Sequence, residues 1–198
     1  MAKYIIGVDE AGRGPLAGPV SIAAVCIRED IYRQFLSHFK EARDSKKVAP
    51  LRREKIVADL KNKIGNGAYF SVTLVHNKTI DKKGIVKALQ IGVLRTLYKL
   101  EINPRKTRIL LDGSLKAPKE FKDQKTIING DDKVKIISLA SIVAKVHRDK
   151  HMRIKAKKYP EYLFDVHKGY GTKIHRQMIE EFGPSDIHRM TFLKNLKI

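Results

Sequence analysis

The chain opens with two apolar segments that flank a loop rich in glycine and proline. Residues 4–27 read YIIGVDEAGRGPLAGPVSIAAVCI. Residues 4–8 and 20–27 are apolar and largely β-branched, which is typical of buried strands. The first segment runs directly into Asp9 and Glu10. This stretch therefore predicts a hairpin of two strands, with an acidic pair where the first strand ends.

The remainder of the chain alternates helical and strand patterns. The pattern predicts further strands at 69–75, 107–111 and 125–129, helices at 31–40, 51–63, 79–100 and 136–158, and two short helices after residue 170 that are broken at Gly183-Pro184. No linker separates two cores. We therefore expect residues 1–198 to form one α/β domain, with a core over about 1–160 and a helical C-terminal cap over about 161–198.

The composition is strongly basic. The 198 residues include 41 Lys and Arg against 21 Asp and Glu, a formal net charge of +20, which favours a polyanionic partner over a small neutral metabolite. Cys26 is the only cysteine, so an intrachain disulfide and a cysteine-based zinc site are both excluded. No apolar run has the length of a membrane span, and the first residues lack a signal-peptide apolar block. We expect a cytoplasmic protein that does not contact membranes.

A few carboxylates stand at the ends of apolar segments. Asp9 ends the first strand, Asp112 ends the strand at 107–111, and Asp131 follows Gly130 just before the long helix. A buried carboxylate is costly unless it is paired or bound to a metal. With Glu10, these acids could converge on divalent cations, and an oxygen-only ligand set suits Mg²⁺ or Mn²⁺ better than zinc.

Some of these acids have alternative interpretations. Asp9 and Glu10 would face opposite sides of a regular strand, so both can serve one site only if the strand ends or twists at Glu10. Asp131 or Asp132 could instead be the N-cap of the following helix. Asp149 lies mid-helix between basic residues, where a local ion pair is the expected role.

The glycines after the acidic pair also fit a second pattern. Gly12 to Ala17 matches the loose G-x-G-x-x-A of dinucleotide-binding folds. That motif should open a helix, whereas Pro19 leads into another strand. Asp9 and Glu10 would also place negative charge where a pyrophosphate must lie. The dinucleotide interpretation is therefore disfavoured.

Taken together, these blocks resemble the ribonuclease HII family. The matching motifs follow the family's order from Gly7 to about Phe192: the 7–19 segment, Asp44-Ser45-Lys46-Lys47, Leu111-Asp112-Gly113, Gly130-Asp131, residues 140–149, residues 167–172, and Gly183-Pro184-Ser185 with His188-Arg189. The resemblance implies an RNase H-like fold, with a mixed central sheet flanked by helices. It also implies endonucleolytic cleavage of the RNA strand of RNA/DNA hybrids, and of duplex DNA at embedded ribonucleotides, which leaves 5′-phosphate and 3′-hydroxyl ends.

The resemblance also implies roles for particular residues. Asp9, Glu10, Asp112 and Asp131 would be the catalytic acids that hold two divalent cations, Mg²⁺ or Mn²⁺, one activating water and the other stabilising the departing 3′ oxygen. Residues that would bind the substrate are Gly12, Arg13 and Gly14 at the 2′-hydroxyl, Tyr170 at the deoxyribose after the junction, and Ser45, Lys46 and Lys145 at phosphates. The expected form is a monomer.

Two other functions stay open. The basic charge alone would suffice for a non-catalytic RNA- or DNA-binding protein, and another two-metal nuclease of the same fold could cut DNA. The basic run at 148–158 is expected to be a solvated helix face or to follow a phosphate backbone. His147 and His151 are four apart on that helix, and we expect them to be surface residues rather than metal ligands.

Overall fold

The computed structural model describes residues 3–44, 48–65 and 67–194. A mixed five-stranded sheet runs through its centre in the order β3-β2-β1-β4-β5. The strands are β1 (Tyr4–Ala11), β2 (Val20–Arg28), β3 (Ala68–Val75), β4 (Thr107–Asp112) and β5 (Asp123–Ile127). β2 pairs antiparallel with β1 and β3, whereas β4 pairs in parallel with β1 and β5. The five strands expected from the sequence and the initial hairpin are confirmed, with small shifts of their ends.

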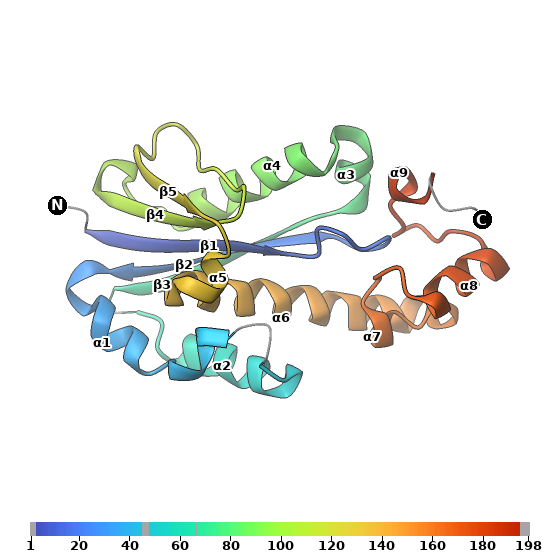
Figure 1. Cartoon of the computed structure of the whole chain (residues 1–198), viewed down its shortest axis with the longest axis horizontal. Coiled ribbons are helices and arrows are strands. Elements are labelled where there is room, and N and C mark those ends of the chain that lie inside the picture. The colour runs from blue at the N-terminus through green and yellow to red at the C-terminus, as the bar shows by residue number, and fades with distance from the viewer. Residues whose placement is uncertain (1–2, 45–47, 66, 195–198) are drawn as a thin grey trace.

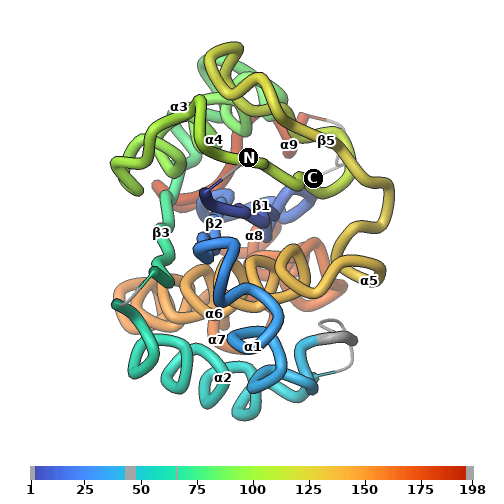
Figure 2. The backbone as a smooth tube through the Cα atoms, turned by 90° about the vertical axis from the view of Figure 1, so that its left-hand side faces the viewer, coloured from blue at the N-terminus to red at the C-terminus, as the bar shows by residue number. Residues whose placement is uncertain are grey.

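Helices cover both faces of the sheet (Figures 1 and 2). One face carries α4, the other carries the long helix α6, and α2 packs on the side of α6 away from the sheet. The helices are α1 (Tyr32–Ser37), α2 (Pro50–Asn62), α3 (Asn77–Lys83), α4 (Ile85–Tyr98), α5 (Gly130–Lys133), α6 (Lys135–Lys158), α7 (Phe164–His167), α8 (Lys173–Phe182) and α9 (Met190–Leu193). Short 3₁₀ turns occupy Glu29–Ile31, Lys40–Asp44, Pro104–Lys106 and Pro160–Tyr162.

Alternation along β1 divides its side chains between two apolar cores. Ile6 and Val8 are fully buried in the core beneath α4, whereas Ile5 packs into the core beneath α6. Gly7 faces the same side as Ile5, and a Cβ there would lie 2.5 Å from the main chain of Ile136 at the start of α6. Glycine therefore lets α6 lie directly on β1. Asp9 follows in the same alternation and faces α6.

One predicted helix is wrong. The apolar spacing over 79–100 predicts a single helix, but the structure has α3 and α4 with Gly84 between them. Gly84 has φ of +77°, a conformation in which glycine avoids the strain of a Cβ, and it ends one helix and begins the next. The helix expected at 31–40 is also shorter: α1 covers only Tyr32–Ser37, with 3₁₀ turns on both sides.

The C-terminal residues form a third apolar cluster with the loop between β1 and β2. Leu16 and Ala17 of that loop pack with Met152 of α6 and with Phe164 and Ile179 from the C-terminal helices. The predicted break at Gly183-Pro184 is confirmed, since α8 ends at Phe182, and α7 is an additional short helix. Among the described residues, no helix combines the length and apolar composition needed to cross a membrane.

Candidate functional site

Three carboxylates meet at the end of the central strands. Asp9, Glu10 and Asp112 each present an oxygen, and these oxygens all lie within 4.8 Å of one another. β4 pairs with β1 only as far as Val8, so the next residues of β1 lie beside an open edge, close to Asp112 at the end of β4. We name Asp9, Glu10 and Asp112 the acid cluster.

The expectation about Asp9 and Glu10 needs a correction. We expected the strand to end or twist at Glu10. It does not end there, because β1 stays paired with β2 through Ala11. The two carboxylates nevertheless come within reach of one site, at the point where β4 no longer pairs with β1.

Asp131 lies next to the acid cluster without belonging to the set of mutually close oxygens. Oδ1 of Asp112 accepts hydrogen bonds from the amides of Gly130, at 2.6 Å, and Asp131, at 3.4 Å. The Asp131 side chain is 5% exposed, and its charge contributes to raising the pKa of Glu10. The N-cap of the long helix α6 is Val134, and Asp131 and Asp132 lie within α5, whose N-cap is Asn129, so the N-cap interpretation of Asp131 or Asp132 is wrong.

Burial and mutual repulsion make the acid cluster unfavourable when it is fully ionised. Burial of Asp9, which is only 4% exposed, raises its pKa well above the ordinary value, and the charges of Glu10 and Asp112 raise it further. Hydrogen bonds from the Ser141 side chain and the Glu10 amide oppose this rise. The pKa of Glu10 is also raised by burial, against the pull of Arg13 at 3.6 Å.

This donor set fits a divalent cation that prefers oxygen. Cations neutralise converging carboxylates, and a site of carboxylate oxygens without histidine or cysteine matches the ligand preference of Mg²⁺ and Mn²⁺. The acid cluster, with Asp131 beside it, therefore provides the ligand chemistry that was expected from the sequence.

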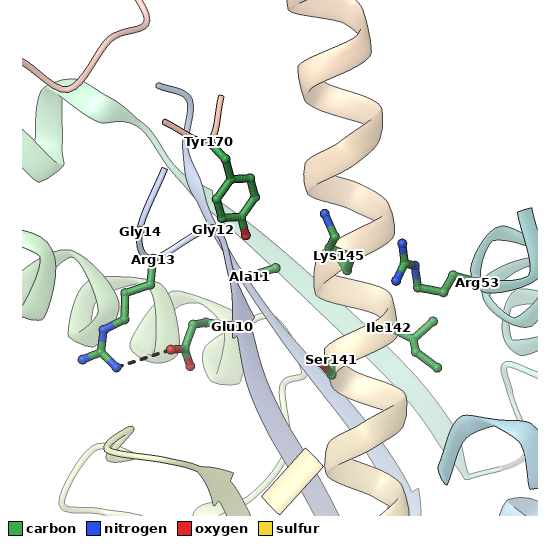
Figure 3. Close-up of a pocket in the computed structure, with 10 residues that line it drawn as sticks. All are labelled: Glu10, Ala11, Gly12, Arg13, Gly14, Arg53, Ser141, Ile142, Lys145 and Tyr170. Carbon is green, nitrogen blue, oxygen red and sulfur yellow. Dashed lines mark ion pairs between the residues drawn. The ribbon is translucent and has the colours of Figure 1, made fainter. Parts of the chain in front are cut away.

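A pocket of about 400 Å³ opens beside Glu10. Figure 3 shows β1 and the following loop on one side of it, α6 on the other, and Tyr170 reaching in between them. Five of the predicted substrate-binding residues line this pocket: Gly12, Arg13, Gly14, Lys145 and Tyr170. The other two, Ser45 and Lys46, lie outside the described residues.

Basic groups surround the aromatic ring of Tyr170. The ring is partly exposed, with Nζ of Lys145 at 5.9 Å and Cζ of Arg148 at 5.5 Å from its centroid. Lys145 also forms an ion pair with Asp149 at 2.7 Å, which confirms the local ion pair expected for Asp149. The pocket thus combines cationic groups and an aromatic face, the two features that bind a phosphate backbone and its sugars or bases.

Sequence reasoning missed two residues of this site. Arg53 of α2 lines the pocket, and its charge contributes to lowering the pKa of Lys145, mainly lowered by burial. Ser141 hydrogen-bonds Asp9. In the sequence, Ser141 belonged to the matching block 140–149 but had no role assigned to it, and Arg53 was one charge of a basic helix.

The interpretation of the basic run at 148–158 is wrong for its first member. Arg148 is fully buried and donates hydrogen bonds to the main-chain oxygens of Pro19, Ala17 and Lys168. His147 and His151 are half-buried rather than surface residues, and Nδ1 of His147 donates a hydrogen bond to the Val143 carbonyl oxygen at 2.8 Å. The helix turns these side chains toward neighbouring elements, which a count of charges along the sequence does not reveal.

Comparison with known proteins points to one family. A family model described as Ribonuclease HII matches residues 6–195. Ribonuclease HII of Caldicellulosiruptor saccharolyticus is 43% identical over 98% of this chain and 89% of its own length. Ribonuclease HII of Clostridium perfringens strain SM101 is 40% identical over 98% of this chain and 68% of its own length.

Solved structures agree with the fold. Ribonuclease H2 from Pyrococcus horikoshii OT3 is 28% identical, with a TM-score of 0.65 over 97% of this chain and 100% of that one. RNase HII in a PCNA complex from Archaeoglobus fulgidus has a TM-score of 0.76 at 21% identity, covering 98% of this chain and 95% of that one. Bst-RNase HIII in complex with Mn²⁺ has a TM-score of 0.72 at 18% identity, covering 96% and 65%. These likenesses confirm the expected RNase H fold.

Proposed function

Since the chain belongs to the ribonuclease HII family, we propose that its acid cluster is the catalytic centre of a type 2 ribonuclease H. Membership of the family makes the protein an endoribonuclease that hydrolyses RNA in RNA/DNA hybrids. The observation that carries the assignment to this site is the convergence of Asp9, Glu10 and Asp112 beside the pocket that contains Gly12, Arg13 and Gly14.

In this proposal Asp9, Glu10, Asp112 and Asp131 hold two divalent cations, Mg²⁺ or Mn²⁺. When bound, the cations supply an activated water and charge stabilisation at the departing 3′ oxygen. The acid cluster supports this role because its carboxylates, of which Asp9 is buried, repel one another and offer only oxygen donors.

The protein's own groups orient these ligands. The hydroxyl of Ser141 fixes the Asp9 carboxylate from α6, and the amide of Gly130 fixes Asp112 from the start of α5. Each contact joins a ligand to a helix outside the sheet, which preorganises the acids before substrate binds. We propose direct hydrolysis without a covalent enzyme intermediate, leaving a 5′-phosphate and a 3′-hydroxyl.

The pocket binds the substrate strand in the same proposal. Gly14 has open space where a Cβ would lie, so main-chain groups at residues 12–14 can approach the 2′-hydroxyl of a ribonucleotide closely. Lys145 and Arg53 neutralise phosphates, Tyr170 packs on the deoxyribose after the junction, and Ser45 and Lys46 bind further phosphates. This arrangement extends the substrate range to single ribonucleotides within duplex DNA.

We also propose that the protein acts as a cytoplasmic monomer on nucleic acid, with residues 1–198 forming one catalytic domain and about 161–198 forming its cap. The net charge of +20 supports the polyanionic partner.

Cleavage of defined duplexes tests the proposal. A duplex with one ribonucleotide, an RNA/DNA hybrid and an all-DNA duplex are incubated with the protein in EDTA, Mg²⁺ or Mn²⁺. We expect metal-dependent nicking of the first two, with 3′-hydroxyl ends that a polymerase can extend. A folded protein that binds all three without nicking would be a nucleic-acid-binding protein, and efficient cutting of the all-DNA duplex would contradict the proposed role of residues 12–14.

A further inference from the structure

The loop that follows β1, residues 12–19, is held by a buried guanidinium from the other end of the chain. Arg189 is fully buried, and its side chain donates three hydrogen bonds to this loop: to the carbonyl oxygens of Gly12 at 2.7 Å, Arg13 at 2.8 Å and Gly18 at 2.9 Å. The amide of Arg189 also donates to Leu16. We name residues 12–19 the glycine loop.

A second buried guanidinium joins the glycine loop to the segment that carries Tyr170. Arg148 of α6 donates to the carbonyl oxygens of Pro19 at 3.0 Å and Ala17 at 3.2 Å, and to that of Lys168 at 2.9 Å. It also lies against Gly12, where a Cβ would come 1.9 Å from Nε of Arg148. The same guanidinium therefore contacts both main-chain segments that border the pocket.

Neither guanidinium belongs to an ion pair found among the described residues. Main-chain carbonyl oxygens accept hydrogen bonds from both side chains, whereas Nη1 of Arg148 has no hydrogen-bond partner in the described part of the chain. Burial lowers the pKa of Arg189 to about 9. Such burial is energetically costly, and a lysine could not replace these contacts, because only the planar guanidinium has several donors at fixed angles. The hydrogen bonds of the two arginines thus fix the positions of particular carbonyl groups, which a positive charge alone would not do.

We propose that Arg148 and Arg189 are positioning residues for ribonucleotide recognition: they hold the main chain of the glycine loop where it can read the 2′-hydroxyl, and fix Tyr170 relative to it. Neither side chain lines the pocket, so they act through the loop. This inference rests on the proposed function, in which residues 12–14 recognise the 2′-hydroxyl.

The test compares single-nucleotide substrates that differ only at the 2′ position. Duplex DNA with one ribonucleotide and the same duplex with one 2′-fluoronucleotide are cut by the wild type, by Arg189→Lys and by Arg148→Lys, and kcat/KM is measured for each. Its ratio between the two substrates is the 2′-hydroxyl preference. We expect this preference to fall at least about tenfold in each variant, since the lysines lose geometry rather than charge. Stabilisation of the metal-free protein by Mn²⁺ should persist, because the acid cluster is intact.

Controls separate positioning from general folding. Arg108→Lys alters an exposed arginine of β4 that pairs with Asp123 of β5, outside the site, and should keep the wild-type preference. Arg189→Ala is assayed with and without millimolar methylguanidinium, which should restore part of the preference. A folded Arg→Lys variant with a lower rate but an unchanged preference would overturn the inference and leave the proposed function standing. Absence of the preference in the wild type would overturn both.

Discussion

Asp9 combines a structural cost with the role of a cation ligand. Because burial raises its pKa in the folded protein, the folded state releases this proton less readily than the unfolded chain. The protonated Asp9 carboxyl therefore contributes to the free energy of unfolding at low pH. This contribution is lost as pH rises from the pKa of the unfolded chain through the higher pKa of the folded protein. We expect Asp9→Asn to raise the unfolding temperature of the metal-free protein at pH 7.5.

The same substitution should remove function. Asp9→Asn should abolish most of the stabilisation by Mn²⁺ and reduce cleavage by about a hundredfold or more, since a ligand of a catalytic ion is lost. Thermal unfolding in EDTA and in Mn²⁺ measures the first effect, and nicking of a single-ribonucleotide duplex the second. Asp59→Asn, an exposed acid on α2, is the matched control. Equal Mn²⁺ stabilisation of wild type and Asp9→Asn would exclude Asp9 as a ligand.

Gly12 and Gly14 should respond differently to alanine. Gly12 has φ of +89° and a Cβ there would collide with Arg148, so Gly12→Ala should lower both stability and activity. Gly14 has nothing within 4 Å of the Cβ position, so Gly14→Ala should leave the unfolding temperature within about 1 °C and raise KM if substrate approaches there. Steady-state kinetics and thermal unfolding measure the two effects. An unchanged KM for Gly14→Ala would remove that residue from the substrate site.

Asp9, Glu10 and Asp112 could be predicted from the sequence because they come at the end of apolar runs, and neighbouring strands of a sheet bring such positions together. Arg148 could not. Its position in a basic helix favoured a solvated side chain, and its carbonyl partners lie 20 to about 130 positions away. Local sequence carries no sign of such a contact, since any main-chain carbonyl can accept the bond.

Among the elements, strands were more predictable than helix boundaries. β1 to β4 contain apolar runs, so their existence follows from composition, whereas β5 is the mostly polar DQKTI and overlaps the expected 125–129 only in part. The helix over 79–100 failed because the apolar spacing continues across Gly84, whose φ of +77° interrupts the main chain but leaves the side-chain pattern nearly in phase. Glycine is tolerated inside helices often enough that the sequence alone did not indicate a break.

The C-terminal segment contains buried histidines whose hydrogen bonds require neutral rings. Ser185 donates its amide to Nδ1 of His188, and Nε2 of His188 and His175 lie 3.0 Å apart. Nδ1 of His175 lies 2.9 Å from the Tyr170 carbonyl and must donate to it. Because Nδ1 of His188 accepts from Ser185, Nε2 of neutral His188 carries the proton and donates it to Nε2 of His175. Protonating His175 would put a second proton into this 3.0 Å contact and abolish the hydrogen bond. Burial accordingly lowers the pKa of His175 and of His188 to about 4.

This network predicts a loss of stability in mild acid. A histidine with a lowered folded pKa takes up its proton more readily when unfolded, so stability falls as pH decreases from about 6.5 towards 4. Each unit of pKa shift corresponds to about 1.4 kcal/mol, so His175→Gln should reduce the pH-dependent loss in free energy of unfolding by roughly 2–3 kcal/mol. Urea unfolding at pH 7.5, 5.5 and 4.5 measures this loss in the wild type and in the variant. His38→Gln, at an exposed position, should keep the wild-type dependence of the free energy of unfolding on pH. If His175→Gln also kept that dependence, His175 would not be a source of the acid-induced loss of stability.

At the scale of the whole molecule, the net charge attracts nucleic acid, whereas the geometry of the site decides which groups contact the strand. A net charge of +20 attracts any phosphate backbone, whereas only groups close to the strand release its counterions on binding. Affinity for a single-ribonucleotide duplex in EDTA should therefore fall steeply with salt, and Lys145→Gln and Arg53→Gln, which line the pocket, should each reduce the slope of log affinity against log salt by about 1. The control is Lys122→Gln, which removes the same charge at an exposed position between β4 and β5. This variant should weaken binding slightly and leave the slope of log affinity against log salt unchanged. Fluorescence anisotropy from 50 to 300 mM KCl gives all four slopes. Equal slopes for the Lys145 and Lys122 variants would mean that net charge alone binds the duplex, and that the pocket beside Glu10 does not contact its phosphates.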